Sequence, residues 1–178
     1  MEDDDVQVRS IVLNHRVPCT GFLFREKTKP RKLLVQKLQQ LNIPFSSYAA
    51  IKNGEDYTDD FGKKISNKEL TENPPSPASY AYCSDTVYDE NIIEDVRNVD
   101  LLYHEATFGH DLLDRAVATY HTTAKQAAQI ALAAQVKNLL IGHFSARYKE
   151  LTPLLDEAIE VFSQTQLALE GKKFLVRE

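Results

Sequence analysis

Histidine and carboxylate residues follow several predicted strands of this chain, and these residue types bind first-row metal ions. Five such residues follow four strands: His15 after residues 6–13, Asp85 after 78–83, His104 and Glu105 after 99–103, and His143 after 136–142. In open α/β sheets, ligands bind beyond the carboxyl ends of the strands. Imidazole and carboxylate groups are usual zinc ligands, and two neighbouring ions can stabilise a phosphoryl transition state. The pattern therefore predicts a metal site in which His15, Asp85 and His143 supply three ligands.

Each of these residues also has an ordinary structural explanation. A single histidine after a strand is often a polar loop residue, and Asp85-Thr86 before a helix can act as a cap. His121 could cap or pack near an alanine-rich segment, and we interpret His110 as a surface residue. The joint pattern at four strand ends favours a metal site, but spacing alone does not identify a substrate.

The elements that would position these residues alternate along the chain between strands and helices, which is typical of an α/β layered fold. The predicted strands are 6–13, 19–25, 78–83, 99–103, 136–142 and a last edge strand at 173–176. The predicted helices are 31–41, a short one at 92–98, 111–119, 123–135 capped by Thr122 or Thr123, and 153–163 opened by Thr152-Pro153. Residues 52–79 carry Gly, Asp and Pro runs and are predicted to be an irregular surface excursion.

Composition narrows the class of protein. The chain has 178 residues, of which 26% are charged and 43% hydrophobic, as in an ordinary globular domain. No apolar run is long enough to span a membrane, and the acidic N-terminus MEDDDVQV does not resemble a secretory signal. The two cysteines, Cys19 and Cys83, form neither a disulfide framework nor a CxxC pair. These features predict a cytoplasmic location.

The net charge of 21 − 26 = −5 hides an asymmetry. Residues 25–70 contain ten Lys or Arg and six Asp or Glu, a net of +4, whereas the remainder has a net of 11 − 20 = −9. The basic excess could be a solvated surface, or it could bind nucleic acid phosphates.

Five short segments, in the same order along the chain, resemble the ribonuclease Z family of tRNA 3′-processing endonucleases in the metallo-β-lactamase superfamily. They are His15-Arg16-Val17-Pro18 followed by Gly21, Tyr82-Cys83-Ser84-Asp85-Thr86, the HEAT segment 104–107, the HTT segment 121–123 against the family's HST, and GHFSARY at 142–148. Each segment alone is weak, but five in the family's order over residues 11–148 are specific.

The resemblance implies a role for each matched residue. His15 and His143 would bind one metal ion each, and Asp85 would bridge two zinc ions. His104 would lie beside the scissile phosphate as a catalytic residue, polarised by Glu105 or His121, and Arg147 would bind phosphate. The enzyme class implied is a zinc-dependent endoribonuclease that removes the 3′ trailer from tRNA precursors.

The resemblance also gives the basic region a meaning. The family carries an inserted arm that grips tRNA, and residues 27–77 occupy its place in this chain. The residues expected to contact RNA are Lys27, Lys29, Arg31, Lys32 and Lys37. The family's Gly-Pro pair is replaced here by Pro44-Phe45-Ser46-Ser47-Tyr48.

The superfamily's main metal motif, HxHxDH, does not occur in these 178 residues. The resemblance therefore implies that the chain is the C-terminal portion of the enzyme, the second half of an αββα sandwich. Without the N-terminal half, we expect weak or no metal binding, no activity, and dimerisation or aggregation through the exposed sheet. The resemblance also implies a homodimer, because ribonuclease Z is typically one. Two alternatives are a small-substrate phosphodiesterase of the same fold and a non-catalytic RNA-binding or dimerisation subunit.

Overall fold

The computed structural model describes residues 2–177, and its contacts divide the chain into two compact units. The first unit, here called the body, comprises the chain up to Glu26 and from Ala78 onwards. The second unit, here called the arm, is Lys27–Pro77. Each unit has a hydrophobic core of its own.

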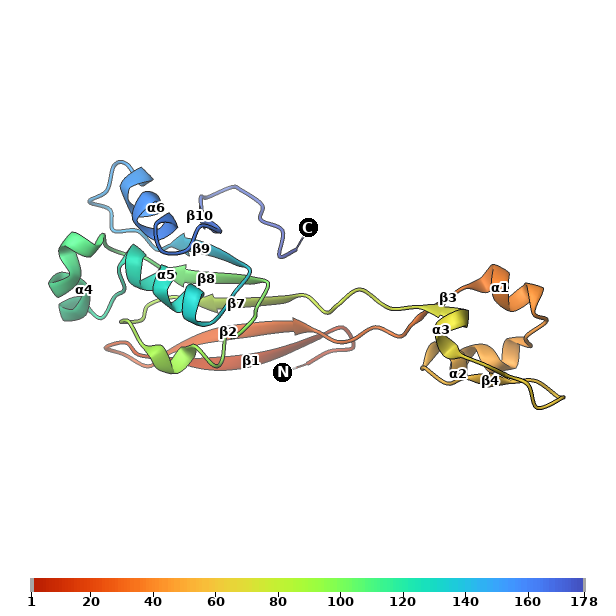
Figure 1. Cartoon of the computed structure of the whole chain (residues 1–178). Coiled ribbons are helices and arrows are strands. Elements are labelled where there is room, and N and C mark those ends of the chain that lie inside the picture. Colours follow the sequence, from red (N-terminus) through yellow and green to blue (C-terminus); the bar gives the residue numbers. More distant parts are fainter. Residues whose placement is uncertain (1, 178) are drawn as a thin grey trace. The chain divides into compact units, whose positions relative to one another are not determined.

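The body is built on a six-stranded sheet in the order β1-β2-β7-β8-β9-β10 (Figure 1). Its strands are β1 Val6–Leu13, β2 Cys19–Glu26, β7 Ser79–Cys83, β8 Leu101–Glu105, β9 Asn138–Gly142 and β10 Thr165–Leu167. β1, β2 and β7 pair antiparallel, whereas β7, β8, β9 and β10 pair parallel. The carboxyl ends of β1, β7, β8 and β9 consequently meet at one edge of the sheet.

Helices cover one face of this sheet. α5 (Ala124–Ala133) packs on β8 and β9, and α6 (Thr152–Ile159) packs on α5 and β10 (Figure 1). The alanines of α5 allow a close approach to the fully buried Leu102, Leu139 and Ile141 of the sheet. The remaining ordered turns of the body are η2 (Glu90–Ile92), η3 (His110–Leu112) and α4 (Leu113–Thr119). The packing of α5 and α6 thus holds β8, β9 and β10 in place from one face of the sheet.

The opposite face of the sheet presents aromatic side chains to solvent. Phe22, Phe24 and Tyr82 are 42%, 36% and 37% exposed. Phe24 stacks on Tyr80 with ring centroids 5.8 Å apart, and Tyr82 stacks on Tyr103 at 4.7 Å. Contiguous apolar surface of this kind usually marks an interface.

The arm has a small core of its own, formed by Leu38, Ile43, Ile51 and Leu70. Its elements are β3 Lys32–Leu33, α1 Val35–Gln40, η1 Phe45–Ser47, α2 Tyr48–Lys52, β4 Tyr57–Thr58, β5 Lys64–Ile65, α3 Asn67–Leu70 and β6 Thr71–Glu72. The buried Asn67 amide donates hydrogen bonds of 2.6 and 2.8 Å to the carbonyls of Ile51 and Glu55. These contacts explain why part of the region predicted to be irregular is ordered.

Most predicted elements are confirmed, with shifts at their ends. The Thr123 cap is confirmed, because its side chain accepts from the Gln126 N–H in a capping box. The predicted edge strand at 173–176 is wrong, since the sheet ends instead with β10, paired parallel to β9. The predicted helix over 31–41 is shortened to α1 because Lys32 and Leu33 pair with β6. The predicted helix at 92–98 is replaced by η2 and turns. Within residues 2–177, no helix is long and apolar enough to cross a membrane.

Candidate metal and catalytic site

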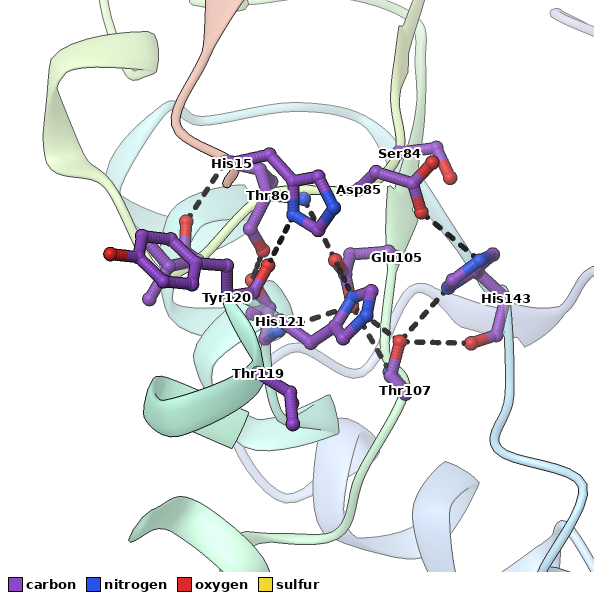
Figure 2. A network of polar contacts seen from close by, with 12 residues as sticks. His15, Ser84, Asp85, Thr86, Glu105, Thr107, Thr119, Tyr120, His121 and His143 are labelled. Carbon is purple, nitrogen blue, oxygen red and sulfur yellow. Dashed lines mark hydrogen bonds and ion pairs between the residues drawn. The ribbon is translucent and has the colours of Figure 1, made fainter. Parts of the chain in front are cut away.

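Four side chains meet at the sheet edge where the parallel strands end. Asp85, Glu105 and His143 come from the ends of β7, β8 and β9, and His121 comes from the loop between α4 and α5 (Figure 2). Each offers one ligand atom, and these atoms all lie within 4.8 Å of one another. His15, which follows β1, lies beside them, with its ring centroid 5.3 Å from that of His121. The structure thus brings the three predicted metal ligands into one neighbourhood.

The histidines of this site share one feature: the Nδ1 atom of each ring already has a partner. Nδ1 lies 2.9 Å from the Tyr120 carbonyl in His15, 2.8 Å from Glu105 Oε1 in His121, and 3.0 Å from Thr107 Oγ1 in His143. Metal-binding histidines typically bond such oxygens through the nitrogen that does not face the metal. The Nε2 atoms are therefore left for a ligand, and that of His143 lies 3.0 Å from Asp85 Oδ1. Imidazole nitrogens beside the Asp85 carboxylate suit a first-row metal ion.

Glu105 anchors the site as a fully buried carboxylate with five donors. Oε1 accepts from the Thr86 N–H and from His121 Nδ1, both at 2.8 Å. Oε2 accepts from the Thr107 hydroxyl at 2.6 Å, the Thr107 N–H at 3.4 Å and the Thr122 N–H at 3.1 Å. Burial alone would raise the pKa of Glu105, but the hydrogen bonds from His121, the Thr107 hydroxyl and the Thr122 N–H, with the charge of His121, hold it below its ordinary value.

His121 responds in the opposite direction. The hydrogen bond to Glu105 raises the pKa of His121 above its ordinary value, although partial burial opposes the shift. The charges of Glu105 and Asp85 also raise it, and Arg16 lowers it. A raised pKa keeps a larger fraction of the imidazole protonated near neutral pH, which suits a proton donor.

The backbone is strained at several of these positions. Asp85, Tyr120 and His143 have φ angles of 55°, 60° and 57°, in the left-handed region that non-glycine residues rarely adopt. Tyr120 ends α4 in this conformation, and its own carbonyl is the one that His15 contacts. Strained non-glycine residues cluster at functional sites, which supports the assignment of this edge as the site.

His104 does not join this group. β8 continues two residues beyond its predicted end, so His104 lies within the strand and is 0% exposed. Its Nδ1 lies 2.8 Å from the Glu105 carbonyl, and its Nε2 has no hydrogen-bond partner. His104 is thus shielded from solvent, whereas His121 is partly exposed beside Asp85 and His143.

The burial of His104 should make the stability of the chain depend on pH. Burial lowers the pKa of His104 below its ordinary value of 6.5. Below pH 6.5, His104 is protonated in the unfolded chain but stays neutral in the folded chain. Acidification therefore favours the unfolded chain, and His104 lowers the free energy of unfolding. We expect His104→Asn to lose less stability than the unaltered chain between neutral and mildly acidic pH. Urea unfolding at neutral and at mildly acidic pH measures the two losses. Equal losses of stability in His104→Asn and in the unaltered chain would contradict the prediction.

The other predicted site residues lie elsewhere or have partners of their own. Arg147 places its guanidinium 5.2 Å from the centroid of the Phe108 ring and donates to Ser145 Oγ at 3.2 Å. His110, which was predicted to be a surface residue without a role, is only partly exposed and contacts Thr123 Oγ1 at 3.3 Å. The sequence assigned no role to Thr107 or to the Tyr120 carbonyl; Thr107 belongs to the HEAT segment, which was the available signal.

Four of the arm residues that are expected to contact RNA fall into two groups. Arg31 donates to Thr71 Oγ1 at 2.6 Å and to Asn73, and Lys32 pairs with Glu72 at 3.0 Å. For Lys29 and Lys37, the described part of the chain records no ion pair.

Comparison with solved structures identifies the fold. The chain aligns with the metallo-β-lactamase fold protein YhfI from Bacillus subtilis at a TM-score of 0.61 and 18% identity, covering 97% of this chain and 50% of that one. The short form of human tRNase Z aligns at a TM-score of 0.53 and 20% identity, covering 94% and 42%. The body is therefore part of a metallo-β-lactamase fold.

Comparison of sequences identifies relatives of one kind within this fold. Ribonuclease Z of Bacteroides thetaiotaomicron is 49% identical over 171 residues, which is 96% of this chain and 54% of that protein. Ribonuclease Z of Parabacteroides distasonis is 46% identical over 176 residues, covering 99% and 58%. No protein-family model matches the chain. The chain is a homologue of ribonuclease Z, and it spans about half the length of these curated relatives.

Proposed function

We propose that this chain supplies part of the active site of a zinc-dependent endoribonuclease that removes the 3′ trailer from tRNA precursors. The observation that carries the proposal is the Glu105–His121 pair, held at 2.8 Å beside Asp85 and His143. The 46–49% identity to curated ribonuclease Z proteins supports the substrate class.

The chemistry divides between metal ligands and the Glu105–His121 pair. Asp85, His143 and His15 would hold zinc, which supplies Lewis acidity and a hydroxide nucleophile when bound. His121 would donate a proton from Nε2 to the leaving oxygen, while Glu105 accepts the Nδ1–H and stabilises the imidazolium. His121 takes the role that the sequence suggested for His104.

The experiment is cleavage of a precursor tRNA by the complete natural protein, followed by analysis of both product ends. We expect a 3′-hydroxyl on the tRNA and a 5′-phosphate on the trailer. RNA binding without cleavage would instead support a non-catalytic subunit. Cleavage confined to a small phosphodiester would point to a different hydrolase.

We also propose that the arm binds the tRNA. Residues 27–77 contain nine Lys or Arg and six Asp or Glu, so the net charge is 9 − 6 = +3, against 12 − 20 = −8 for the rest of the chain. Lys29 and Lys37 are the best candidates for phosphate contacts because neither is engaged in a recorded ion pair within residues 2–177. Phosphate contacts provide affinity and orientation rather than sequence recognition.

Replacing Lys29 and Lys37 by alanine in the complete protein is expected to raise KM for precursor tRNA and leave kcat close to its original value. Each lost phosphate contact should also reduce the slope of log affinity against log salt by about 1. Lys172→Ala, an exposed charge in the body, is the matched control. Unchanged binding and salt dependence in the double variant would contradict an RNA-binding role for these lysines.

The exposed aromatic face of the sheet fits this proposal. The curated relatives extend well beyond the matched region, and we propose that this additional sequence covers Phe22, Phe24 and Tyr82. That sequence would also complete the metal ligand set as the second layer of an αββα sandwich. We also propose that the complete protein forms a homodimer and is located in the cytoplasm, as predicted from the sequence.

A further inference from the structure

Thr107, two residues beyond Glu105, lies between the Glu105–His121 pair and His143 in Figure 2. Its hydroxyl lies 2.6 Å from Glu105 Oε2, 3.0 Å from His143 Nδ1 and 3.0 Å from the His143 carbonyl. The residue is 6% exposed, so water does not compete freely for these contacts. One side chain therefore joins the Glu105–His121 pair to the ligand His143.

The direction of these hydrogen bonds follows from counting protons. A threonine hydroxyl has one hydrogen to donate. The shortest contact is to the buried Glu105 carboxylate, and hydrogen bonds to an ionised oxygen are the strongest. If the hydroxyl donated to His143 Nδ1 instead, its lone pairs would face the carboxylate oxygen at 2.6 Å, which is repulsive. The hydrogen therefore goes to Glu105 rather than to the His143 carbonyl, which lies farther away at 3.0 Å, and the hydroxyl accepts from His143 Nδ1–H.

We propose that Thr107 is a positioning residue that fixes the tautomer of His143, keeping a proton on Nδ1 and directing Nε2 to the metal. The chain of donors runs from His143 Nδ1–H to the Thr107 hydroxyl and from that hydroxyl to Glu105. His143 Nε2 already lies 3.0 Å from Asp85 Oδ1, where a proton or a cation must separate the two groups. Nδ1 thus stays protonated while Nε2 exchanges its proton for a metal ion. The inference deepens the proposed metal site and rests on it.

The first test needs no variant and no metal. Nitrogen-15 NMR of the unaltered, metal-free chain distinguishes protonated from unprotonated ring nitrogens. We expect Nδ1 of His143 to carry a proton, whether or not Nε2 shares one with Asp85. An unprotonated Nδ1 would overturn the inference, and it would do so without bearing on tRNA cleavage.

The second test compares Thr107→Val, which lacks the hydroxyl, with Thr107→Ser, which keeps it. In Thr107→Val we expect a mixture of His143 tautomers and, in the complete protein, zinc affinity about 10–100-fold weaker, as for other residues that support metal ligands. Thr107→Ser should restore both. Thr165→Val is the control, since Thr165 is also 6% exposed but donates to the Phe162 carbonyl.

The outcomes separate the inference from the proposed function. Unaltered protein that binds no zinc would defeat the proposed metal site, while the NMR result would still decide the tautomer. Thr107→Val with unchanged His143 signals and unchanged zinc affinity would overturn the role of Thr107 alone. If Thr107→Val does not fold, the tautomer of the unaltered chain and the behaviour of Thr107→Ser remain decisive.

Discussion

Replacing His121 by alanine in the complete protein is expected to slow precursor tRNA cleavage by about 10²–10⁴-fold, the usual contribution of a general acid. The reason is its position: Nδ1 is held 2.8 Å from Glu105, while the ring lies among the side chains grouped for metal binding. Single-turnover cleavage with saturating enzyme measures the effect on the chemical step. The KM for precursor tRNA should change little, because the proposed RNA contacts lie in the arm.

The control for this variant is His110→Ala, which removes another partly buried histidine of the body. His110 contacts Thr123 and is not in the group around Asp85. We expect its cleavage rate to stay close to that of the unaltered protein. Cleavage by His121→Ala within a few-fold of the unaltered rate would contradict the role of His121.

Replacing Glu105 by leucine is expected to destabilise the chain by about 3–5 kcal/mol, as when one partner of a buried charged pair is removed. The carboxylate is 0% exposed, so no solvent can replace it. Its loss would leave the Thr86 and Thr122 N–H groups, the Thr107 hydroxyl and His121 without their acceptor. Urea or thermal unfolding measures the difference in free energy.

Two further variants distinguish the loss of the Glu105 charge from the loss of its shape and hydrogen bonds. Glu105→Gln keeps the shape and one acceptor oxygen, and we expect a smaller loss than for leucine. Glu90→Gln alters an exposed carboxylate that contacts Tyr88, and we expect a change within about 0.5 kcal/mol. A Glu105→Leu variant as stable as the unaltered chain would show that the five hydrogen bonds are not required for folding.

The strands and the edge at which they end could be predicted because their signals are local. β-branched residues mark β1 and alternating apolar residues mark β2, and parallel pairing brings the ends of β7, β8 and β9 together. The positions of Asp85 and His143 follow directly from that geometry. The HEAT segment was recognisable from its letters, but the separate placements of its four side chains were not.

The burial of His104 inside β8 has a physical cause. Polar residues at 104 and 105 suggested that the strand had ended, yet His104 and Glu105 pair with Ile141 and Gly142 of β9. The partners that permit burial of Glu105 include Thr86 and Thr122, which are 19 and 17 residues away. Contacts between residues this far apart in the sequence cannot be predicted from the local sequence pattern.

The order within the arm was also beyond local signals. The Gly and Pro runs between residues 52 and 79 favour loops, but Leu38, Ile43, Ile51 and Leu70 form a core from separated positions. The side chain of Asn67 then pins the intervening turn. Long-range packing therefore overrides the local turn composition here.

The most direct test of the central claim is the metal dependence of trailer cleavage by the complete natural protein. Metal would be removed by chelation and zinc returned in steps, with the unaltered protein and Asp85→Ala measured side by side. The site described here predicts that chelation abolishes cleavage and that zinc restores it in the unaltered protein but not, at the same concentration, in Asp85→Ala. Full cleavage by the metal-free protein, or equal restoration in both, would contradict it.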